Sequence, residues 1–178
     1  MVTLKATIAH IKSDIYNHGG VTFKKKVNVY LFNASFRLLL NYRIGRYLRQ
    51  RRNFISNFIL QRYEYRQVTK RNCYISFRAS IGSNFRFAHP IGVIIGENVV
   101  IGDNVRIWQN VTLGSHGKKE QALIYPQIGN NVKIFAGAKL FGGITIGDGA
   151  AIGANAVVNT DVPANKTAVG IPAKVLGS

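Results

Sequence analysis

His89 and Pro90 stand where a regular pattern in the sequence is broken. In the run RFAHPIGVIIGENVVIG, two extra residues interrupt a period of six that is otherwise kept. An irregularity of this kind in a repeat exposes a side chain, and imidazole is the side chain whose ordinary pKa lies nearest to neutrality. The sequence therefore predicts an accessible histidine at position 89.

A second break follows in LGSHGKKEQALIYPQIG, residues 113–129. It supplies fifteen positions where twelve would keep the period, and its polar core SHGKKEQ cannot belong to an apolar ladder. We therefore expect residues 114–127 to leave the repeat as an excursion. Long excursions from a rigid scaffold often cover active sites.

A helix that ends at Gly19-Gly20 would carry a third candidate. Its two faces would be formed by Ile8, Ile11 and Ile15 and by His10, Asp14 and His18. Two imidazoles and a carboxylate at four-residue spacing could bind a metal. With one acidic member and no further ligand cluster, the sequence favours a solvated polar face, and no metal is expected.

A six-residue repeat must position these candidates. Every sixth residue from Ile95 to Leu113, and again from Ile128 to Val158, is a large aliphatic that is often followed by Gly. Such a period marks a repeat architecture and predicts a triangular parallel β-helix, with Gly and Asn at corners where φ is positive. An ordinary β-sandwich would not keep this phase over so many repeats. A weaker start at Ile81 and Phe87 places the first coil near residue 75.

Length and composition predict one compact subunit of 178 residues. Cys73 is alone and no signal-peptide pattern is present, so we expect neither disulfides nor secretion, and the cytoplasm is the default. The expected organisation is a basic α-helical region over 1–71, a β-helix over 72–163 that includes the excursion, and a C-terminal tail over 164–178. The fold class is thus mainly β with a helical N-terminal region.

The positive charge is concentrated in the first part of the chain. Residues 1–71 hold fifteen Lys or Arg against Asp14 and Glu64. The apolar stretch 27–48 is too interrupted by arginines to span a bilayer. Three explanations stay open: helices that cap the β-helix with Arg on solvated faces, a surface that also rests on anionic lipid at the inner membrane face, and a nucleic-acid arm. No recognised nucleic-acid module accompanies the charge, so nucleic acid is not expected as a partner.

Three runs of sequence carry a family resemblance. They are AHPIGVIIGENVVIGDNVRIWQNVTLG, GNNVKIFAGAKLFGGITIGDGAAIGANAVV and AVGIPAKVLG. From about residue 12 to the end, the chain resembles the hexapeptide-repeat acyltransferases, and among these the serine acetyltransferases and the short exopolysaccharide or capsule O-acetyltransferases related to them. The resemblance implies a left-handed β-helix, acetyl-CoA as co-substrate, and a homotrimer whose active sites lie between neighbouring β-helices.

The resemblance also implies roles for individual residues. His89 matches the general base that takes the proton of an acceptor hydroxyl. The candidate oxyanion donors are the backbone N–H groups of Ser115, His116 and Gly117. The positions that match the CoA site are Ala136, Gly137, Ala154 and, for a phosphate, Lys174. As alternatives, the small residues serve only the geometry of the corners, and His116 and Lys174 are surface side chains with no role in binding or catalysis.

The chain departs from the serine acetyltransferase pattern at the acceptor. Ala88, Tyr74 and Ile124-Tyr125 stand where that family has acidic residues and an Arg-His pair, although Asp14 matches a substrate-side acid. The candidate acceptor-binding residues are Asp14, Trp108, Gln109, Asn110 and Tyr125, and Trp108 could equally pack a trimer.

From the missing groups we expect a sugar hydroxyl of a polysaccharide or a lipid-linked precursor as acceptor. Serine O-acetylation and a non-catalytic β-helix scaffold are the alternatives.

Overall fold

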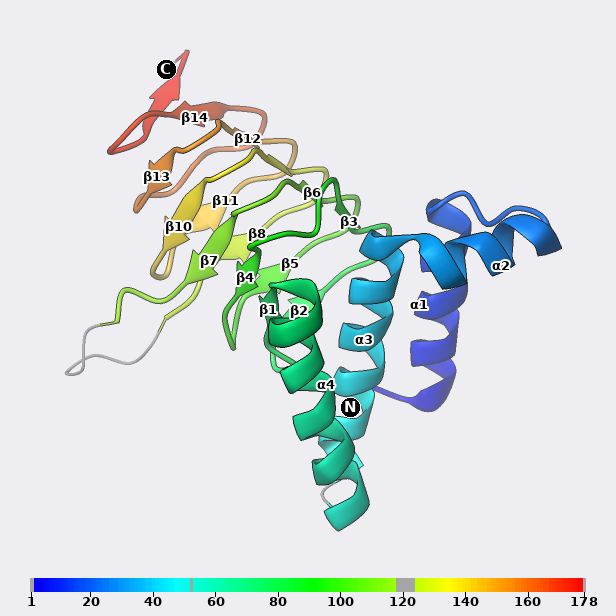
Figure 1. The fold of residues 1–178 in the computed structure, drawn as a ribbon. Helices are drawn as coiled ribbons and strands as arrows, with labels where there is room; N and C mark the ends of the chain where they lie inside the picture. Colours follow the sequence, from blue (N-terminus) through cyan, green and yellow to red (C-terminus); the bar gives the residue numbers. More distant parts are fainter. Residues whose placement is uncertain (1, 52, 118–123, 178) are drawn as a thin grey trace.

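The structure is a computed structural model that describes residues 2–51, 53–117 and 124–177 (Figure 1). Helices come first: α1 (Leu4–Asn17), α2 (Phe23–Phe32), α3 (Ala34–Leu48), the short 3-10 helix η1 (Arg49–Arg51) and α4 (Phe54–Arg71). Each α-helix begins after a Thr or Asn whose side chain accepts a hydrogen bond from an N–H group of the first turn. These caps satisfy backbone donors that a helix start otherwise leaves free.

Short strands follow and form three sheets. Sheet A holds β1 (Tyr74–Ile75), β4 (Ile94–Ile95), β7 (Thr112–Gly114), β10 (Lys139–Phe141) and β13 (Val157–Val158); sheet B holds β2 (Ser80–Ile81), β5 (Val100–Ile101), β8 (Gln127–Ile128) and β11 (Thr145–Ile146); sheet C holds β3 (Arg86–Phe87), β6 (Arg106–Ile107), β9 (Lys133–Ile134), β12 (Ala151–Ile152), β14 (Thr167–Val169) and β15 (Lys174–Leu176). The strand pairs are parallel except for β15, which runs antiparallel to β14.

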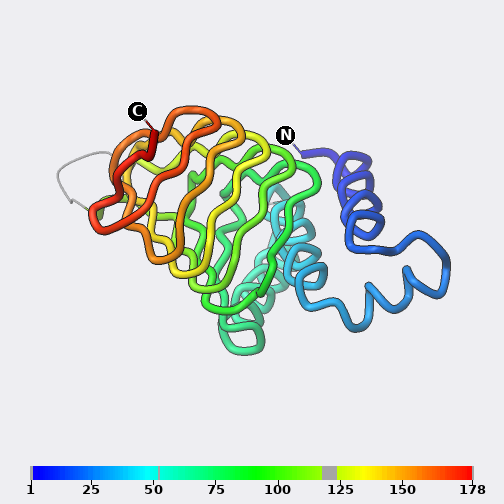
Figure 2. Tube along the Cα trace, turned by 90° about the horizontal axis from the view of Figure 1, so that it is seen from above, coloured from blue at the N-terminus to red at the C-terminus, as the bar shows by residue number. Residues whose placement is uncertain are grey.

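The chain visits the sheets in the repeating order A, B, C, so each coil is three-sided and stacks on the one before it (Figure 2). Two edges of this β-helix matter below. The C–A edge, between sheets C and A, comprises residues 88–93, 108–111, 135–138 and 153–156. The A–B edge comprises residues 76–79, 96–99, 115–117, 124–126 and 142–144. The first coil starts at Tyr74, close to the predicted position.

The interior of the β-helix is a set of apolar ladders. The inward residues of the strands are Ile75, Ile95, Leu113, Leu140 and Val158 in sheet A, Ile81, Ile101, Ile128 and Ile146 in sheet B, and Phe87, Ile107, Ile134, Ile152 and Ala168 in sheet C, all at most 3% exposed. Burial of each large side chain contributes about 1.5–3 kcal/mol. The predicted six-residue ladder is confirmed.

The corners have the predicted chemistry. Every described non-glycine residue with positive φ is an asparagine, with φ between 48° and 60°. Gly137 has a φ of 76°, and a Cβ there would clash with the Asn155 amide oxygen on the next coil. Asn and Gly are the residues that adopt this backbone conformation at low cost.

Helix α3 covers the open end of the β-helix and satisfies its carbonyl groups. Arg43 donates to the carbonyls of Ile81 and Gly82, both at 2.6 Å. Arg46 and the Tyr42 hydroxyl donate to the carbonyl of Ala79 at 2.7 and 2.8 Å. One of the three explanations left open by the sequence placed these arginines on the solvated faces of capping helices. The helix does cap the β-helix, but Arg43 is only 5% exposed, because carbonyl groups at a sheet end buried under a helix need donors.

Helix α1 packs through polar residues. Its buried positions are Thr7 and Asp14, whereas Ile8 is 43% exposed. Asp14 forms an ion pair with Arg43 (Nε to Oδ2, 3.0 Å). The predicted solvated polar face was therefore wrong at Asp14, because Arg43 of α3 supplies a partner that makes its burial tolerable.

None of the described helices is both long enough and apolar enough to cross a membrane. The predicted boundary at residue 163 falls just before β14, which pairs in parallel with β12 and extends sheet C by one further coil. Beyond it, β15 turns back along β14 and ends the described chain.

Candidate active site

His89 lies on the C–A edge, between β3 and β4, with an exposed side chain. The segment around it is anchored through its backbone. The His89 carbonyl accepts from Ile91 N–H at 2.9 Å, Gly92 N–H donates to the Asn72 carbonyl at 2.8 Å, and the Cys73 thiol contacts the Pro90 carbonyl at 3.3 Å. The two extra residues thus present an imidazole on a fixed corner.

The next corners of the same edge carry the other predicted residues. Trp108, Gln109 and Asn110 form the corner above His89, followed by Ala136-Gly137 and by Ala154. Backbone bonds link successive corners: Asn110 N–H to the Ile91 carbonyl at 2.9 Å, Gly137 N–H to the Gln109 carbonyl at 2.9 Å, and Asn155 N–H to the Ala136 carbonyl at 2.8 Å. The base candidate and the small residues matched to CoA therefore share one edge.

Trp108 is fixed by its own chain. Its ring packs against Phe135 with centroids 4.6 Å apart and planes at 30°. Neighbouring Gln109 has a side-chain oxygen that is buried and without a hydrogen-bond partner among the described residues. An aromatic platform and an unsatisfied amide therefore lie one coil, roughly 4.8 Å, from the His89 corner.

The excursion leaves from the opposite side of sheet A. Ser115, His116 and Gly117 follow β7 on the A–B edge, and residues 118–123 lie outside the described part of the chain. Tyr125 is buried on the same edge, where its ring lies 2.6 Å from the position a Cβ of Gly96 would occupy. Within one chain, sheet A separates these residues from His89.

Asp14 is not on the C–A edge but beneath the first coil. Oδ2 is bound to Arg43, and Oδ1 is buried without a partner among the described residues. Burial raises the pKa of this carboxyl, more than the Arg43 guanidinium lowers it. A carboxylate oxygen with no partner at such a depth is a costly feature.

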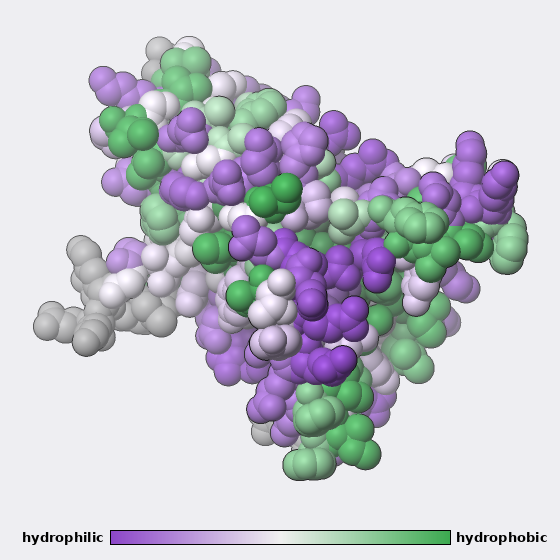
Figure 3. Space-filling view, viewed as in Figure 1, coloured by the Kyte–Doolittle hydropathy of each residue, from purple (hydrophilic) through white to green (hydrophobic). Residues whose placement is uncertain are grey.

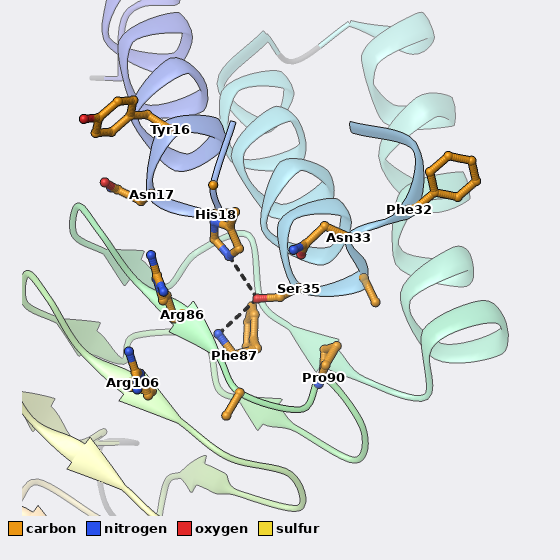
Figure 4. Close-up of a pocket in the computed structure, with 13 residues that line it drawn as sticks. Tyr16, Asn17, His18, Phe32, Asn33, Ser35, Arg86, Phe87, Pro90 and Arg106 are labelled. Atoms are coloured by element: carbon orange, nitrogen blue, oxygen red, sulfur yellow. Dashed lines mark hydrogen bonds between the residues drawn. The ribbon is translucent and has the colours of Figure 1, made fainter. Parts of the chain in front are cut away.

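A groove of about 860 Å³ opens between sheet C and the ends of α1 and α3 (Figure 4). We call it the basic groove. It is lined by Tyr16, Asn17, His18, Gly19, Phe32, Asn33, Ala34, Ser35, Arg86, Phe87, Ala88, Pro90 and Arg106. Ala88 and Pro90 flank His89 in the chain, so the groove reaches the segment that carries His89, although His89 is not among its lining residues.

Arg86 and Arg106 were not predicted as site residues from the sequence. Each directly precedes an inward residue of the ladder, which makes it outward-facing. The signal was present, because the same position one coil later is Lys133. A basic residue in three successive outward positions could have been recognised from the repeat.

His18 and Ser35 form a second feature of the groove. From the sequence, His18 was considered only as part of a polar helix face with His10 and Asp14, and its contact with Ser35 was not predicted. His18 Nδ1 lies 2.7 Å from the Asp14 carbonyl, and Nε2 lies 3.1 Å from the Ser35 hydroxyl. A carbonyl only accepts, so we assign the proton to Nδ1, and the Ser35 hydroxyl donates to Nε2. Ser35 Oγ in turn accepts from Phe87 N–H at 3.2 Å, which ties α1 and α3 to the strand before His89 (Figure 4).

Burial lowers the pKa of His18, which favours the neutral imidazole that this arrangement requires. Among the described residues, no group of three or more His, Cys, Asp or Glu side chains is placed to hold a metal ion. Lys174 is exposed on β15, at the far end of the β-helix from the helices.

Comparisons with known proteins agree with this architecture. The family model described as bacterial transferase hexapeptide (six repeats) matches residues 125–160. A serine acetyltransferase of Buchnera aphidicola is 37% identical over 146 residues, which is 82% of this chain and 55% of the relative. The structure of soybean serine acetyltransferase complexed with serine superposes with a TM-score of 0.84 at 32% identity, over 97% of this chain and 70% of the soybean chain.

A serine acetyltransferase structure in complex with CoA gives a TM-score of 0.82 at 30% identity, over 97% of this chain and 71% of that one. The chain spans 55% of the Buchnera relative and 31% of a chloroplastic serine acetyltransferase of Arabidopsis thaliana. Its likeness to the soybean structure covers both the helices and the β-helix. The chain therefore belongs to the hexapeptide-repeat acyltransferase family and resembles the serine acetyltransferases within it.

Proposed function

We propose that this protein is an acetyl-CoA-dependent serine O-acetyltransferase with His89 as its general base. The observation that carries the proposal is the exposed His89 imidazole on an edge lined by small residues, in a chain that resembles serine acetyltransferases over nearly its whole length. The soybean relative was solved with serine, and another with CoA. Both ligands suit a base that activates a hydroxyl beside a groove for a thioester.

The sequence-based prediction of a sugar acceptor was wrong. The relatives and solved structures reported above are serine acetyltransferases, and none of them supports a polysaccharide O-acetyltransferase. The prediction relied on side chains missing at positions 74, 88 and 124. A missing group at one position does not exclude the same charge from another element, and the basic groove offers such charges.

The chemistry proposed for His89 is proton transfer in both directions. Its neutral imidazole takes the proton of the serine hydroxyl while the oxygen attacks the thioester carbonyl, so that a C–O bond forms. The imidazolium then returns the proton to the sulfur as the C–S bond breaks, which leaves O-acetylserine and free CoA. General-base assistance of this kind contributes roughly 10²–10⁴ in rate.

The C–A edge suits an extended thioester. Ala136, Gly137 and Ala154 keep side-chain bulk low, and Gly137 could not carry a Cβ without a clash. From the spacing of about 4.8 Å per coil, Ala136 lies roughly 10 Å from the His89 corner. Lys174 lies farther along the same direction, and its ammonium group would bind a CoA phosphate.

The complete site is proposed to form between copies in a homotrimer of left-handed β-helices. His89 and the donors at residues 115–117 lie on opposite sides of sheet A, so the excursion of a neighbouring chain is the suitable source of oxyanion donors. Sedimentation analysis would test this, and a stably monomeric, active enzyme would contradict it.

Thiol release from acetyl-CoA, measured with L-serine, tests the proposed function. We expect wild type to release CoA, and His89→Ala to lose roughly 10²–10⁴-fold in rate while its stability changes by less than about 1 kcal/mol. Asn159→Ala, at an exposed position on the far side of sheet A, is the control. If acetyl-CoA does not bind in calorimetry, the non-catalytic scaffold becomes the better account.

A peripheral membrane contact also remains a proposal, with the cytoplasm as the expected location. Phe54, Ile55 and Phe58 are exposed at the start of α4, beside the basic η1 (Figure 3). Apolar side chains with flanking arginines suit anionic lipid. Co-flotation with anionic but not neutral vesicles, weakened by salt, is the expected result; equal behaviour with both vesicles would contradict it.

A further inference from the structure

Sheet C carries a row of positive charges along its outer face. Arg86 pairs in register with Arg106, and Arg106 with Lys133. Neighbouring strands are about 4.8 Å apart, and like charges directly opposite each other destabilise a sheet. The ion pairs of the described residues are Arg43 with Asp14 and Arg78 with Glu97, so none of the three cations is neutralised there.

Two of these three cationic side chains line the basic groove. Arg86 and Arg106 line it from successive strands, and Figure 4 shows them on the side that faces the C-terminal end of α1. No Asp or Glu is among the residues that line it, whereas Asn17, Asn33 and Ser35 add polar groups. A cavity of about 860 Å³ is of the size of small-molecule sites, and its charge favours an anion.

The groove lies within reach of the reacting hydroxyl. Arg86 lies on β3 and His89 on the corner that follows this strand, three residues later, and three residues span at most about 10 Å. Ala88, between them, is small and lines the groove. A small acceptor with its hydroxyl at His89 can therefore extend its other end toward the guanidinium groups.

We propose that Arg86 and Arg106 bind the carboxylate of the acceptor. This inference rests on the proposed function and deepens it, because it names the group that distinguishes serine from neutral alcohols. Guanidinium groups bind carboxylates through paired, charge-assisted hydrogen bonds. The carboxylate site then comes from sheet C of the chain that carries His89, whereas Ile124 on the A–B edge offers no charge.

The test compares L-serine with serinamide, which keeps the hydroxyl and the amine but lacks the carboxylate. Arg86→Met and Arg106→Met should each raise KM for L-serine by roughly 10-fold or more, as expected for charged hydrogen bonds. KM for acetyl-CoA and the rate with serinamide should change less than about 2-fold. The preference for L-serine over serinamide then falls, and Arg86→Lys recovers part of it because a point charge remains.

Lys133→Met is the matched control, since it removes a cation from the same face one coil beyond the groove. An unchanged preference in both arginine variants, or an equal loss in Lys133→Met, would overturn the assignment. Thermal midpoints close to wild type establish that the variants fold.

Failure of the proposed function gives a different result. If wild type releases no CoA with L-serine, the proposed function falls, and the arginines are tested by calorimetric titration with L-serine. Heat of binding in wild type that is lost in the Arg86→Met/Arg106→Met double variant supports the carboxylate site. Equal heats, or no binding to wild type, overturn it.

Discussion

The β-helix and the helical N-terminal region are held together in different ways. The β-helix repeats one apolar contact many times, with inward side chains that are at most 3% exposed along three ladders. The helical region is joined to it by apolar packing of α3, whose Leu38, Leu39 and Tyr42 belong to the same core, and by polar contacts that occur only once. These polar contacts, which we call the polar joint, are the bonds from Arg43 and Arg46 to first-coil carbonyls, with Arg43 paired to Asp14, and the His18–Ser35–Phe87 chain.

The two regions should therefore differ in how much stability a single substitution removes. Each ladder residue has equivalent neighbours above and below, so the loss of one methyl group is a local change. The polar joint has no second copy, and a buried charge that loses its partner costs far more than a lost apolar contact. The basic groove depends on this joint, because its walls come from both regions.

The largest effect should come from Arg43→Met. It leaves the Asp14 carboxylate buried without a counter-charge and two carbonyls without donors, so unfolding should become easier by about 3–5 kcal/mol. Denaturant titration measures this, with Arg37→Met, an exposed arginine of the same helix, as the control within about 0.5 kcal/mol. A loss of unfolding free energy below about 1 kcal/mol for Arg43→Met would show that the polar contacts of Arg43 contribute little to stability.

Ser35→Ala should cost less, about 1–3 kcal/mol, because it leaves Phe87 N–H and His18 Nε2 without partners. Ser13→Ala is the control: its hydroxyl accepts from Asn17 at an exposed position, where water replaces it. Equal stability of the two variants in denaturant titration would mean that the His18–Ser35 contact does not support the strand before His89.

The β-helix could be predicted from the sequence because its pattern is repeated. The ladder residues, the Asn corners and the exposed His89 follow from a period and its interruption, and each additional coil supports the same phase. The helical region offers no such repetition. The burial of Asp14 and Arg43 is set by each other, from helices that are separate in sequence, and no local pattern indicates that pairing.

The part of the candidate site on the β-helix could likewise be predicted from the sequence, whereas the part formed with the helices could not. His89, Ala136 and Ala154 fall on one edge because the repeat places every corner. The basic groove depends on where α1 and α3 end, so Ser35 and His18 could not be placed beside Arg86 from the sequence. The acceptor was mistaken for a sugar because charges were sought only at positions that match the family.

A single methyl deletion in the core gives a smaller effect. Ile134→Val and Ile152→Val lie on successive coils of sheet C, and each should lower stability by about 0.5–1.5 kcal/mol. The two values should agree, since both residues are fully buried in equivalent positions. A loss in either variant as large as that of Arg43→Met would remove the distinction between redundant ladders and a single joint.

The smallest effect concerns pH and acts on the joint alone. Burial lowers the pKa of His18, and burial together with Arg43 lowers that of His10. Between the folded value and the unfolded value of about 6.5, the unfolded chain binds more protons, so stability rises with pH and falls on acidification through that range. The raised pKa of Asp14 acts in the opposite direction, so the test compares two variants: on acidification from about pH 7.5 to pH 5.5, the thermal midpoint of wild type should fall relative to that of His18→Asn. An imidazolium at His18 cannot accept from Ser35, so the loosened region would be the helices and the groove. Amide exchange that increases equally in the β-helix ladders would contradict this assignment.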